Sequence, residues 1–208
     1  MGILKRKKLI AVAALTLTAM LLFTTVSFAD EVPAGTDNPV NGTETDTVTV
    51  MLTGDLMCQR IQQLRAFDGT SYNFKPTFEY VKNIFDKADI VVGNLETLVS
   101  KSLPLSKDMS RLQNKPYLNA PEEWLDALEY AGFDGFIMAN NHACDGGKTG
   151  IVETLEELDS RSIPHTGLFA DKNSKRYFII EENGIKVGVI SYAAYYNLKD
   201  KFLTDEEQ

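Results

Sequence analysis

Residues 139–147 read Ala-Asn-Asn-His-Ala-Cys-Asp-Gly-Gly and bring together the side chains of this chain that are best suited to chemistry. The segment follows a short apolar run ending at Met138, which predicts a buried strand, and it precedes a helix-like pattern. Asn141 can offer a neutral oxygen to a metal ion, His142 can act as a ligand or an acid, and Asp145 can orient the imidazole through its other nitrogen. A polar turn around a hydrogen-bonded histidine would explain the segment equally well.

Two earlier segments also end predicted strands in acidic or amide side chains. An apolar run at 48–52 stops at Thr53–Gly54–Asp55, and a run at 89–92 stops at Gly93–Asn94–Leu95–Glu96. Each of these ends, taken alone, is more simply a cap or a turn. Since neighbouring parallel strands end at the same sheet edge, we expect the ends to meet. The predicted site comprises Asp55, Asn94, Glu96, Asn140, Asn141, His142 and Asp145.

The ligand types in this set favour a hard or intermediate divalent metal. Carboxylate and amide oxygens together with a histidine suit Mn, Fe, Zn or Mg better than a metal that prefers thiolates. A carboxylate shared by two cations is the usual arrangement of a two-metal centre for phosphoryl chemistry. We therefore predict a divalent-metal site at the ends of these strands, with two ions in a complete domain.

Residues 1–29 are expected to be a secretory signal peptide. Basic residues at 5–8 precede an apolar run from Leu9 to Phe23, and small residues precede Asp30. An uncleaved N-terminal anchor is the alternative, although the run is short for a membrane span. Residues 30–46, rich in Pro, Gly, Asn and Thr, are expected to be a disordered linker before a domain at 47–208. The protein is thus expected to be exported and extracellular or associated with the cell envelope.

The charge balance constrains the partners. The chain has 21 Lys and Arg against 29 Asp and Glu, a formal net charge of −8, which becomes −12 without residues 1–29. Such a surface disfavours nucleic acid, and it would bind an anionic polymer only through a cation bridge or a local basic patch. Cys58 and Cys144 cannot make a disulfide-rich scaffold, but a bridge between them remains open until their geometry is known.

The remaining pattern alternates strands and helices before an antiparallel element. Apolar spacing predicts helices near 78–85, 121–131 and 151–158, strands at 133–138 and 163–169, and a long irregular loop at 100–119. Apolar runs at 177–180 and 185–190 flank Asn183–Gly184, which predicts a hairpin. This order indicates a mixed sheet, or two packed sheets, with helices outside.

Three motifs carry a family resemblance: Gly54–Asp55–Leu56–Met57, Gly93–Asn94–Leu95–Glu96, and the run from Asn140 to Asp145. They resemble the early motifs of the CapA family, the capsule or poly-γ-glutamate synthesis proteins, which are similar to calcineurin-like metallophosphoesterases. The resemblance extends from about Thr47 to the end of the chain. It implies an α/β (α+β) fold, a four-layer αββα sandwich in which two mixed sheets lie between helices.

The resemblance also implies roles for the predicted residues. Asp55 would be a terminal metal ligand, Glu96 a bridging carboxylate and Asn141 a ligand of a second metal. His142 would act on a scissile phosphate as proton donor or electrophile, and Asp145 would orient it. Asn94 and Asn140 would support these side chains.

The sequence departs from the superfamily pattern in two ways. Met57 stands where the broader superfamily has a histidine, and the later histidine motifs are absent. The other histidine, His165, matches no ligand motif and is expected to be structural or at the surface. The chain is therefore expected to be the N-terminal part of a longer, C-terminally incomplete domain.

Three functions are compatible with these patterns. The first is an exported metal-dependent phosphoesterase that acts on a phosphoester substrate. The second is a non-catalytic component of capsule or poly-γ-glutamate assembly or export, with an envelope polymer and capsule-synthesis membrane components as partners. A nucleotide-binding domain is disfavoured because no Gly-x-Gly-x-x-Gly or Gly-Lys-Thr loop follows a predicted strand.

Overall fold

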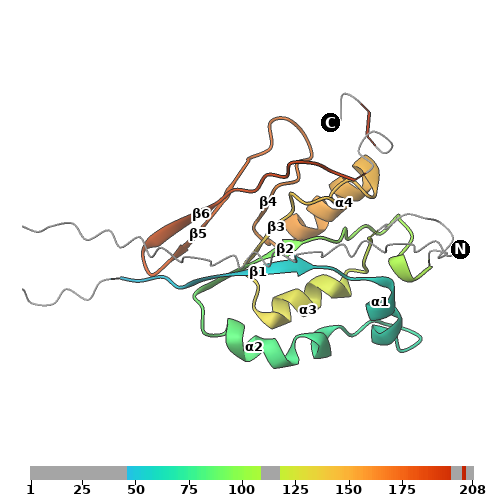
Figure 1. Cartoon of the computed structure of the whole chain (residues 1–208), viewed down its shortest axis with the longest axis horizontal. Coiled ribbons are helices and arrows are strands. Elements are labelled where there is room, and N and C mark those ends of the chain that lie inside the picture. The colour runs from blue at the N-terminus through green and yellow to red at the C-terminus, as the bar shows by residue number, and fades with distance from the viewer. Residues whose placement is uncertain (1–45, 109–117, 198–202, 205–208) are drawn as a thin grey trace, which may run out of the picture. The chain divides into compact units, whose positions relative to one another are not determined.

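Four parallel strands form a sheet in the spatial order β1-β2-β3-β4 (Figure 1). They are β1 (Val50–Leu56), β2 (Ile90–Leu95), β3 (Gly135–Ile137) and β4 (His165–Thr166). The structure, a computed structural model, describes residues 46–108, 118–197 and 203–204. The expected signal peptide at 1–29 and nearly all of the expected linker at 30–46 lie outside these residues.

The helices have buried faces that match the apolar spacing of the sequence. They are α1 (Arg60–Ala66), α2 (Glu79–Phe85), α3 (Glu123–Ala131) and α4 (Gly147–Ser160), with short 3-10 turns η1 (Lys75–Thr77) and η2 (Ser106–Asp108). Trp124, Leu125 and Leu128 form the buried face of α3, which ends at Gly132 with φ 98° as predicted. The sequence analysis did not predict α1. No helix in the described residues has both the length and the apolar character needed to cross a membrane.

Alternate residues of the parallel strands face two separate apolar clusters. Val91, Leu95 and Phe136 belong to a large cluster that they share with residues of α3 and α4. Ile90 and Val92, which point to the other face, cluster with Phe178 of the following hairpin. This alternation is what a strand with both faces covered requires. In Figure 1, α2 and α3 accordingly lie on one side of β1, and the hairpin lies on the other.

The predicted hairpin is confirmed. Its strands, β5 (Phe178–Glu182) and β6 (Ile185–Val189), pair antiparallel. Asn183 and Gly184 have φ values of 52° and 74°. Positive φ at both central residues is the signature of the tight turn that Asn-Gly favours.

The predicted boundaries of β1 to β4 were wrong, and β3 covers only Gly135–Ile137 of the strand predicted at 133–138. β1 and β2 run on through Gly54–Asp55 and through Gly93–Asn94–Leu95, which were predicted to follow the strands. Pairing between β1 and β2 continues to their ends, past a register shift between Leu52 and Asp55, and it outweighs the turn preference of the glycines. The strand predicted at 163–169 is only two residues long, because Pro164 lacks an N–H and Gly167 turns the chain with φ 104°.

The α/β class predicted from the sequence is confirmed. The described residues supply a helical layer, a parallel sheet and a second, antiparallel sheet, so neither sheet is mixed within them as was expected. This arrangement is consistent with a metallophosphoesterase-like sandwich. It places the carboxyl ends of β1, β2 and β3 next to one another.

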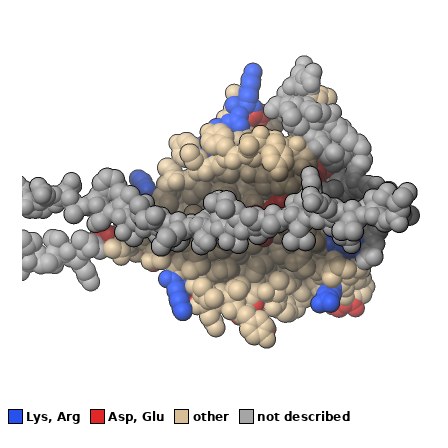
Figure 2. All heavy atoms as spheres, in the orientation of Figure 1, with Lys and Arg blue, Asp and Glu red and all other residues tan. Residues whose placement is uncertain are grey.

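Charged side chains are unevenly placed on the described surface. On the face shown in Figure 2, uncharged residues cover most of the described area, and most Lys and Arg side chains stand apart from one another. A group of basic side chains rises at the top of the view, over the loop between β4 and β5. An acidic side chain stands beside this group, but the loop between β4 and β5 has more basic than acidic residues.

Candidate metal and phosphoester site

Hydrogen bonds between side chains connect the ends of three neighbouring strands. The Asn94 amide, on β2, donates to Asp55 Oδ1 on β1 at 2.8 Å. Asn140, which follows β3, donates from Nδ2 to Asn94 Oδ1 at 3.1 Å and to the Leu95 carbonyl at 3.0 Å. These contacts join residues that are about forty positions apart in the sequence because the strands are parallel and adjacent.

The network continues into the loop between β3 and α4. The backbone N–H of His142 donates to Asn140 Oδ1 at 3.1 Å. The Nδ1 atom of His142 lies 2.7 Å from Asp145 Oδ2, which also accepts the Leu118 N–H at 3.0 Å. With a proton on Nδ1, the imidazole donates to Asp145 and the ring orientation is fixed. Asp145 is 1% exposed, so this contact is shielded from water.

One carboxylate lies on the other side of the imidazole, and a second carboxylate adjoins the first. Glu96 directly follows β2, is buried, and has Oε1 3.8 Å from His142 Nε2. Burial raises the pKa of Glu96, and so do the hydrogen bond and negative charge of the adjacent Asp55. Asp55 itself is exposed. The pair thus has one buried and one open carboxylate, which favours a bound cation or a shared proton between them.

The donors that the structure describes fit one hard divalent ion. Such an ion is commonly held by one or two carboxylates, with amide and water oxygens completing its shell, and Asp55 and Glu96 supply that pair. Asp145 Oδ1, at the same end of the sheet, is buried without a hydrogen-bond partner. In the described residues, however, no three or more His, Cys, Asp and Glu side chains are grouped to hold a metal. A two-ion centre would need further donors.

Asn141 and Met57 do not take part in the side-chain hydrogen bonds described above. The contact that holds Asn141 is made by its backbone carbonyl, which accepts the N–H of Asn197 at 2.8 Å. The residue is half-buried. Met57 directly follows β1, and its thioether cannot replace the imidazole expected of the superfamily as a ligand for a hard metal.

Two residues whose hydrogen bonds hold the ends of β1 and β2, Thr97 and Gln63, were not predicted from the sequence. Thr97 accepts the Cys58 N–H at 2.8 Å and donates to the Leu56 carbonyl at 3.3 Å, which ties β1 to β2. Buried Gln63 of α1 donates to the carbonyls of Cys58 and Asn119. The sequence signals that could have found them are the position of Thr97 directly after Glu96 and the position of Gln63 on the apolar face of a helix.

The segment predicted as an irregular loop at 100–119 is organised around Asn119 where the structure describes it. The Asn119 side chain accepts the Ser100 N–H at 2.8 Å and donates to the carbonyls of Ser100 and Leu103. Residues 109–117 of this predicted loop lie outside the described residues. The described end of the loop presents the Leu118 N–H to Asp145, so it takes part in the site.

The two cysteines are both buried and neither forms a disulfide, so the bridge considered for them is not present. Burial raises the pKa of the Cys58 thiol to about 12. A thiol with such a pKa stays protonated at neutral pH and is a poor nucleophile and metal ligand. Cys58 is therefore a packing residue behind the site.

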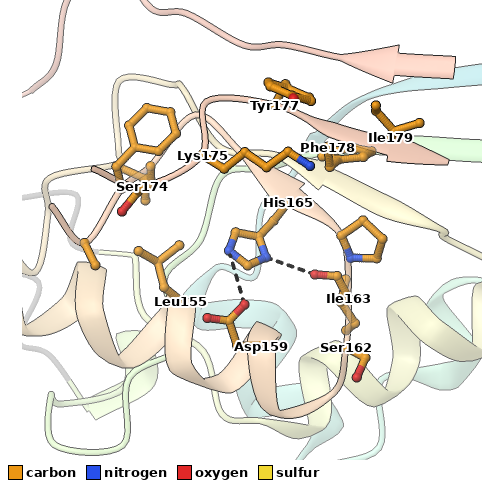
Figure 3. A pocket seen from close by; sticks show the side chains of 14 residues that line it. Leu155, Asp159, Ser162, Ile163, His165, Ser174, Lys175, Tyr177, Phe178 and Ile179 are labelled. Carbon is orange, nitrogen blue, oxygen red and sulfur yellow. Dashed lines mark hydrogen bonds and ion pairs between the residues drawn. The ribbon is translucent and has the colours of Figure 1, made fainter. Parts of the chain in front are cut away.

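His165 lies away from the predicted site, in a cavity of about 570 Å³ beside β4. Its Nδ1 contacts the Ile163 carbonyl at 2.9 Å, and its Nε2 is 3.9 Å from Asp159 (Figure 3). Lys175 also lines this cavity, with its ammonium 4.4 Å from the centre of the Tyr177 ring. These local contacts agree with the structural role expected for His165.

Comparison with known proteins identifies relatives of this chain. The family model described as "Bacterial capsule synthesis protein PGA_cap" matches residues 49–208. The chain is 29% identical over 156 residues to "Capsule biosynthesis protein CapA" of Bacillus anthracis, covering 74% of this chain and 36% of that protein. It is 25% identical over 150 residues to "PGA biosynthesis protein CapA" of Bacillus subtilis (strain 168), covering 71% and 37%. The chain thus spans little more than a third of the length of these two relatives.

Proposed function

From the premise that this chain belongs to the PGA_cap family of bacterial capsule synthesis proteins, we propose that it acts in capsule or poly-γ-glutamate biosynthesis at the cell envelope. Its working part is the site at the carboxyl ends of β1, β2 and β3. The site binds a divalent metal and acts on a phosphoester. Its partners are the envelope polymer and membrane components of capsule synthesis.

The observation that carries the proposal is the meeting of three strand ends at one place. Asp55, Glu96 and His142 come from three separate strand ends, and contacts run from each to the next. A set of unrelated turn residues would not be expected to converge in this way. Convergence of acidic, amide and imidazole groups in a partly buried site is typical of a catalytic or metal-binding centre.

In this proposal each side chain has a distinct task. Asp55 and Glu96 hold the ion, which when bound supplies Lewis-acid polarisation of the phosphoester. Asp145 keeps the proton of His142 on Nδ1, so that Nε2 faces the carboxylates. As a water oxygen attacks the phosphorus atom and the ester P–O bond breaks, a protonated Nε2 would donate its proton to the leaving oxygen. Asn94 and Asn140 hold the strand ends at the required spacing.

A non-catalytic assembly or export component is the second candidate function. It is favoured by the donor count, because the described residues contain no group of three or more metal-binding side chains. It is also favoured by Met57, which removes a ligand expected of the superfamily. In this case the polar network would keep the fold and one cation without turning over a substrate.

Metal binding by the purified chain tests the proposal. We expect Mn²⁺ to bind with one carboxylate-dependent site, and Glu96→Gln to weaken binding on the order of 10- to 100-fold. Glu79→Gln, at an exposed glutamate in the first turn of α2, is the matched control and should leave the affinity unchanged. His142→Ala should weaken binding far less than Glu96→Gln. Equal losses for Glu96→Gln and Glu79→Gln, or absence of Mn²⁺ binding by the unmodified chain, would contradict the metal proposal.

Hydrolysis separates the two candidate functions. If the enzyme proposal holds, Mn²⁺-supplemented chain should cleave generic phosphodiesters, and chelation should abolish this activity. Binding of Mn²⁺ without any cleavage would favour the assembly component instead.

Export is tested independently of the site. The basic residues at 5–8, the apolar run that follows and the small residues before Asp30 support a cleaved signal. Mass spectrometry of the protein recovered from outside the cytoplasm should then find an N-terminus near Asp30. Recovery of the full-length chain from the cytoplasm alone would overturn this part of the proposal.

A further inference from the structure

A second cavity, of about 560 Å³, lies beside the loop that carries His142 and Asp145. Its wall includes Cys144, which stands in that same loop, and residues of the first turns of α4. The opposite wall is the segment after β4, whose Gly167 lies against the backbone of Ala139. The cavity is therefore continuous in the fold with the end of β3, from which the proposed site is built.

Three basic side chains line this cavity although the chain as a whole carries a net charge of −8. Lys148 comes from the first turn of α4, whereas Lys172 and Arg176 come from the loop between β4 and β5. The Arg176 guanidinium lies 3.9 Å from the centre of the Phe169 ring, a cation–π contact that restricts its position. Two separate segments thus place positive charge around one hollow.

Asp171, the acidic residue among the described lining residues, accepts hydrogen bonds from the backbone of its own loop. Asp171 Oδ1 accepts the backbone N–H groups of Asn173 at 2.6 Å and Ser174 at 3.0 Å. These bonds spread its negative charge over the turn. Among the described residues that line the cavity, three are basic and one is acidic, and such an excess of positive charge attracts anions.

The same cavity also has apolar walls. Ile151 and Leu168 are each 8% exposed, and Phe169 and Tyr196 add ring surface. A small inorganic anion would use the basic residues but not these walls. A ligand with carboxylates separated by methylene groups would use both, because the carboxylates pair with the cations and the methylenes cover the apolar surface.

We propose that this basic cavity binds the carboxylate groups of a polyglutamate chain and positions that polymer next to the site at the strand ends. The inference rests on the proposed function in capsule or poly-γ-glutamate biosynthesis, and it adds the place and the chemistry of polymer recognition. It also supplies the local basic patch that an acidic protein requires to bind an anionic polymer directly.

Binding of poly-γ-glutamate oligomers to the purified full chain tests the proposal. The variant Lys148→Gln, Lys172→Gln, Arg176→Gln removes the three cavity charges, and we expect about tenfold weaker binding or more. The control variant Arg65→Gln, Lys87→Gln, Lys186→Gln removes two lysines and one arginine from exposed positions outside the cavity, so both variants have the same net charge. We expect the control to bind within about twofold of the unmodified chain.

Salt and a second anion sharpen the result. Binding by the unmodified chain should weaken with ionic strength more steeply than binding by the cavity variant, because fewer screened charge pairs remain in the variant. Inorganic phosphate at the same concentration of anionic groups should compete poorly. Thermal melts and circular dichroism of both variants verify that each is folded.

Three outcomes would overturn the inference: equal losses in both variants, phosphate competing as well as the polymer, and no polymer binding by the unmodified chain. Each can be told apart from a failure of the proposed function. Mn²⁺ binding and its dependence on Glu96 report on the strand-end site alone. Intact Mn²⁺ binding together with unaffected polymer binding in the cavity variant would overturn only the cavity assignment.

Discussion

The two histidines of this chain, His142 and His165, lie in regions that differ in how they hold the imidazole. Each has an aspartate nearby, but His142 Nδ1 is 2.7 Å from a buried carboxylate, whereas His165 Nε2 is 3.9 Å from Asp159, whose side chain is 75% exposed. The partners of His142 come from the residue that follows β2 and from the loop after β3. The neighbours of His165 come from the end of α4 and from the same turn of chain.

This difference shows that a site depends on where strands end rather than on residue type alone. At the carboxyl ends of β1 to β3, three segments distant in sequence deliver polar groups into a partly buried space. At β4, the Ile163 carbonyl and the Asp159 carboxylate, which the His165 imidazole contacts, belong to residues no more than six positions away. Desolvation strengthens charge interactions in the first region, while solvent screens them in the second.

The largest expected effect tests the chemical half of this comparison. If the phosphoesterase proposal holds, His142→Ala should lower kcat/KM for a generic phosphodiester on the order of 10²- to 10⁴-fold, because the proton donor is lost. His165→Ala is the matched control and should stay within about twofold, since a substitution away from the site is usually small in effect. Steady-state kinetics with Mn²⁺ would measure both. A comparable loss in His165→Ala would end the distinction between the two regions.

Of the two aspartates that contact histidines, only Asp145 is expected to have a large effect on the free energy of unfolding. Asp145→Ala should lower the free energy of unfolding by about 2–4 kcal/mol, because His142 Nδ1 and the buried Leu118 N–H both lose their acceptor. Asp159→Ala should change it by less than about 0.5 kcal/mol, since its contact with His165 is long and exposed. Urea denaturation of both variants provides the measurement. Similar values would show that burial does not distinguish the two contacts.

An intermediate effect is expected where the backbones of the two regions touch. A methyl group on Gly167, which has φ 104°, would lie 2.5 Å from the backbone nitrogen of Ala139. Gly167→Ala should therefore cost about 1–3 kcal/mol, because the obstructing atom is backbone and cannot rotate away. Gly188→Ala has no atom within 4 Å of the new methyl and is the control. Thermal melts that fail to separate the two variants would refute the close approach.

The smallest expected effect concerns the pH dependence contributed by Glu96. Burial and Asp55 raise its pKa in the folded state above the unfolded value of about 4.3, so the folded state favours the protonated form. The stability contributed by this group is complete below the unfolded pKa and is lost as the pH rises through the folded pKa. In chelator, Glu96→Gln should thus become more stable than the unmodified chain as the pH increases above about 4.3. Parallel curves of melting temperature against pH would contradict the raised pKa.

Much of the fold could be predicted from local pattern. The hairpin at Asn183–Gly184, the α3 helix closed by Gly132 and the apolar strands were read from turn chemistry and periodicity. The resemblance to the CapA family, drawn from three strand-end motifs, is confirmed by the family match over 49–208. The ends of β1, β2 and β4 were predicted wrongly, because ladder pairing and the turn at Gly167 depend on neighbours that the local sequence does not specify.

The sequence predicted which residues form the candidate site, but not the hydrogen bonds that connect them. The spacing of motifs named Asp55, Glu96 and His142, yet nothing local indicated that Leu118 would donate to Asp145. Thr97 and Gln63 were missed for the same reason, since their partners lie across a strand pair or a distant loop. Long-range hydrogen bonds of this kind follow from tertiary placement.

By itself the sequence determined the residue types at each strand end, the charge balance and the family, because these depend only on order along the chain. Only the tertiary structure decided that Asp55, Glu96 and His142 meet while His165 does not. It also gathered Lys148, Lys172 and Arg176 around one cavity in an acidic protein. The physical reason is that parallel pairing and core packing set the distances between segments, and charges act through distance and burial.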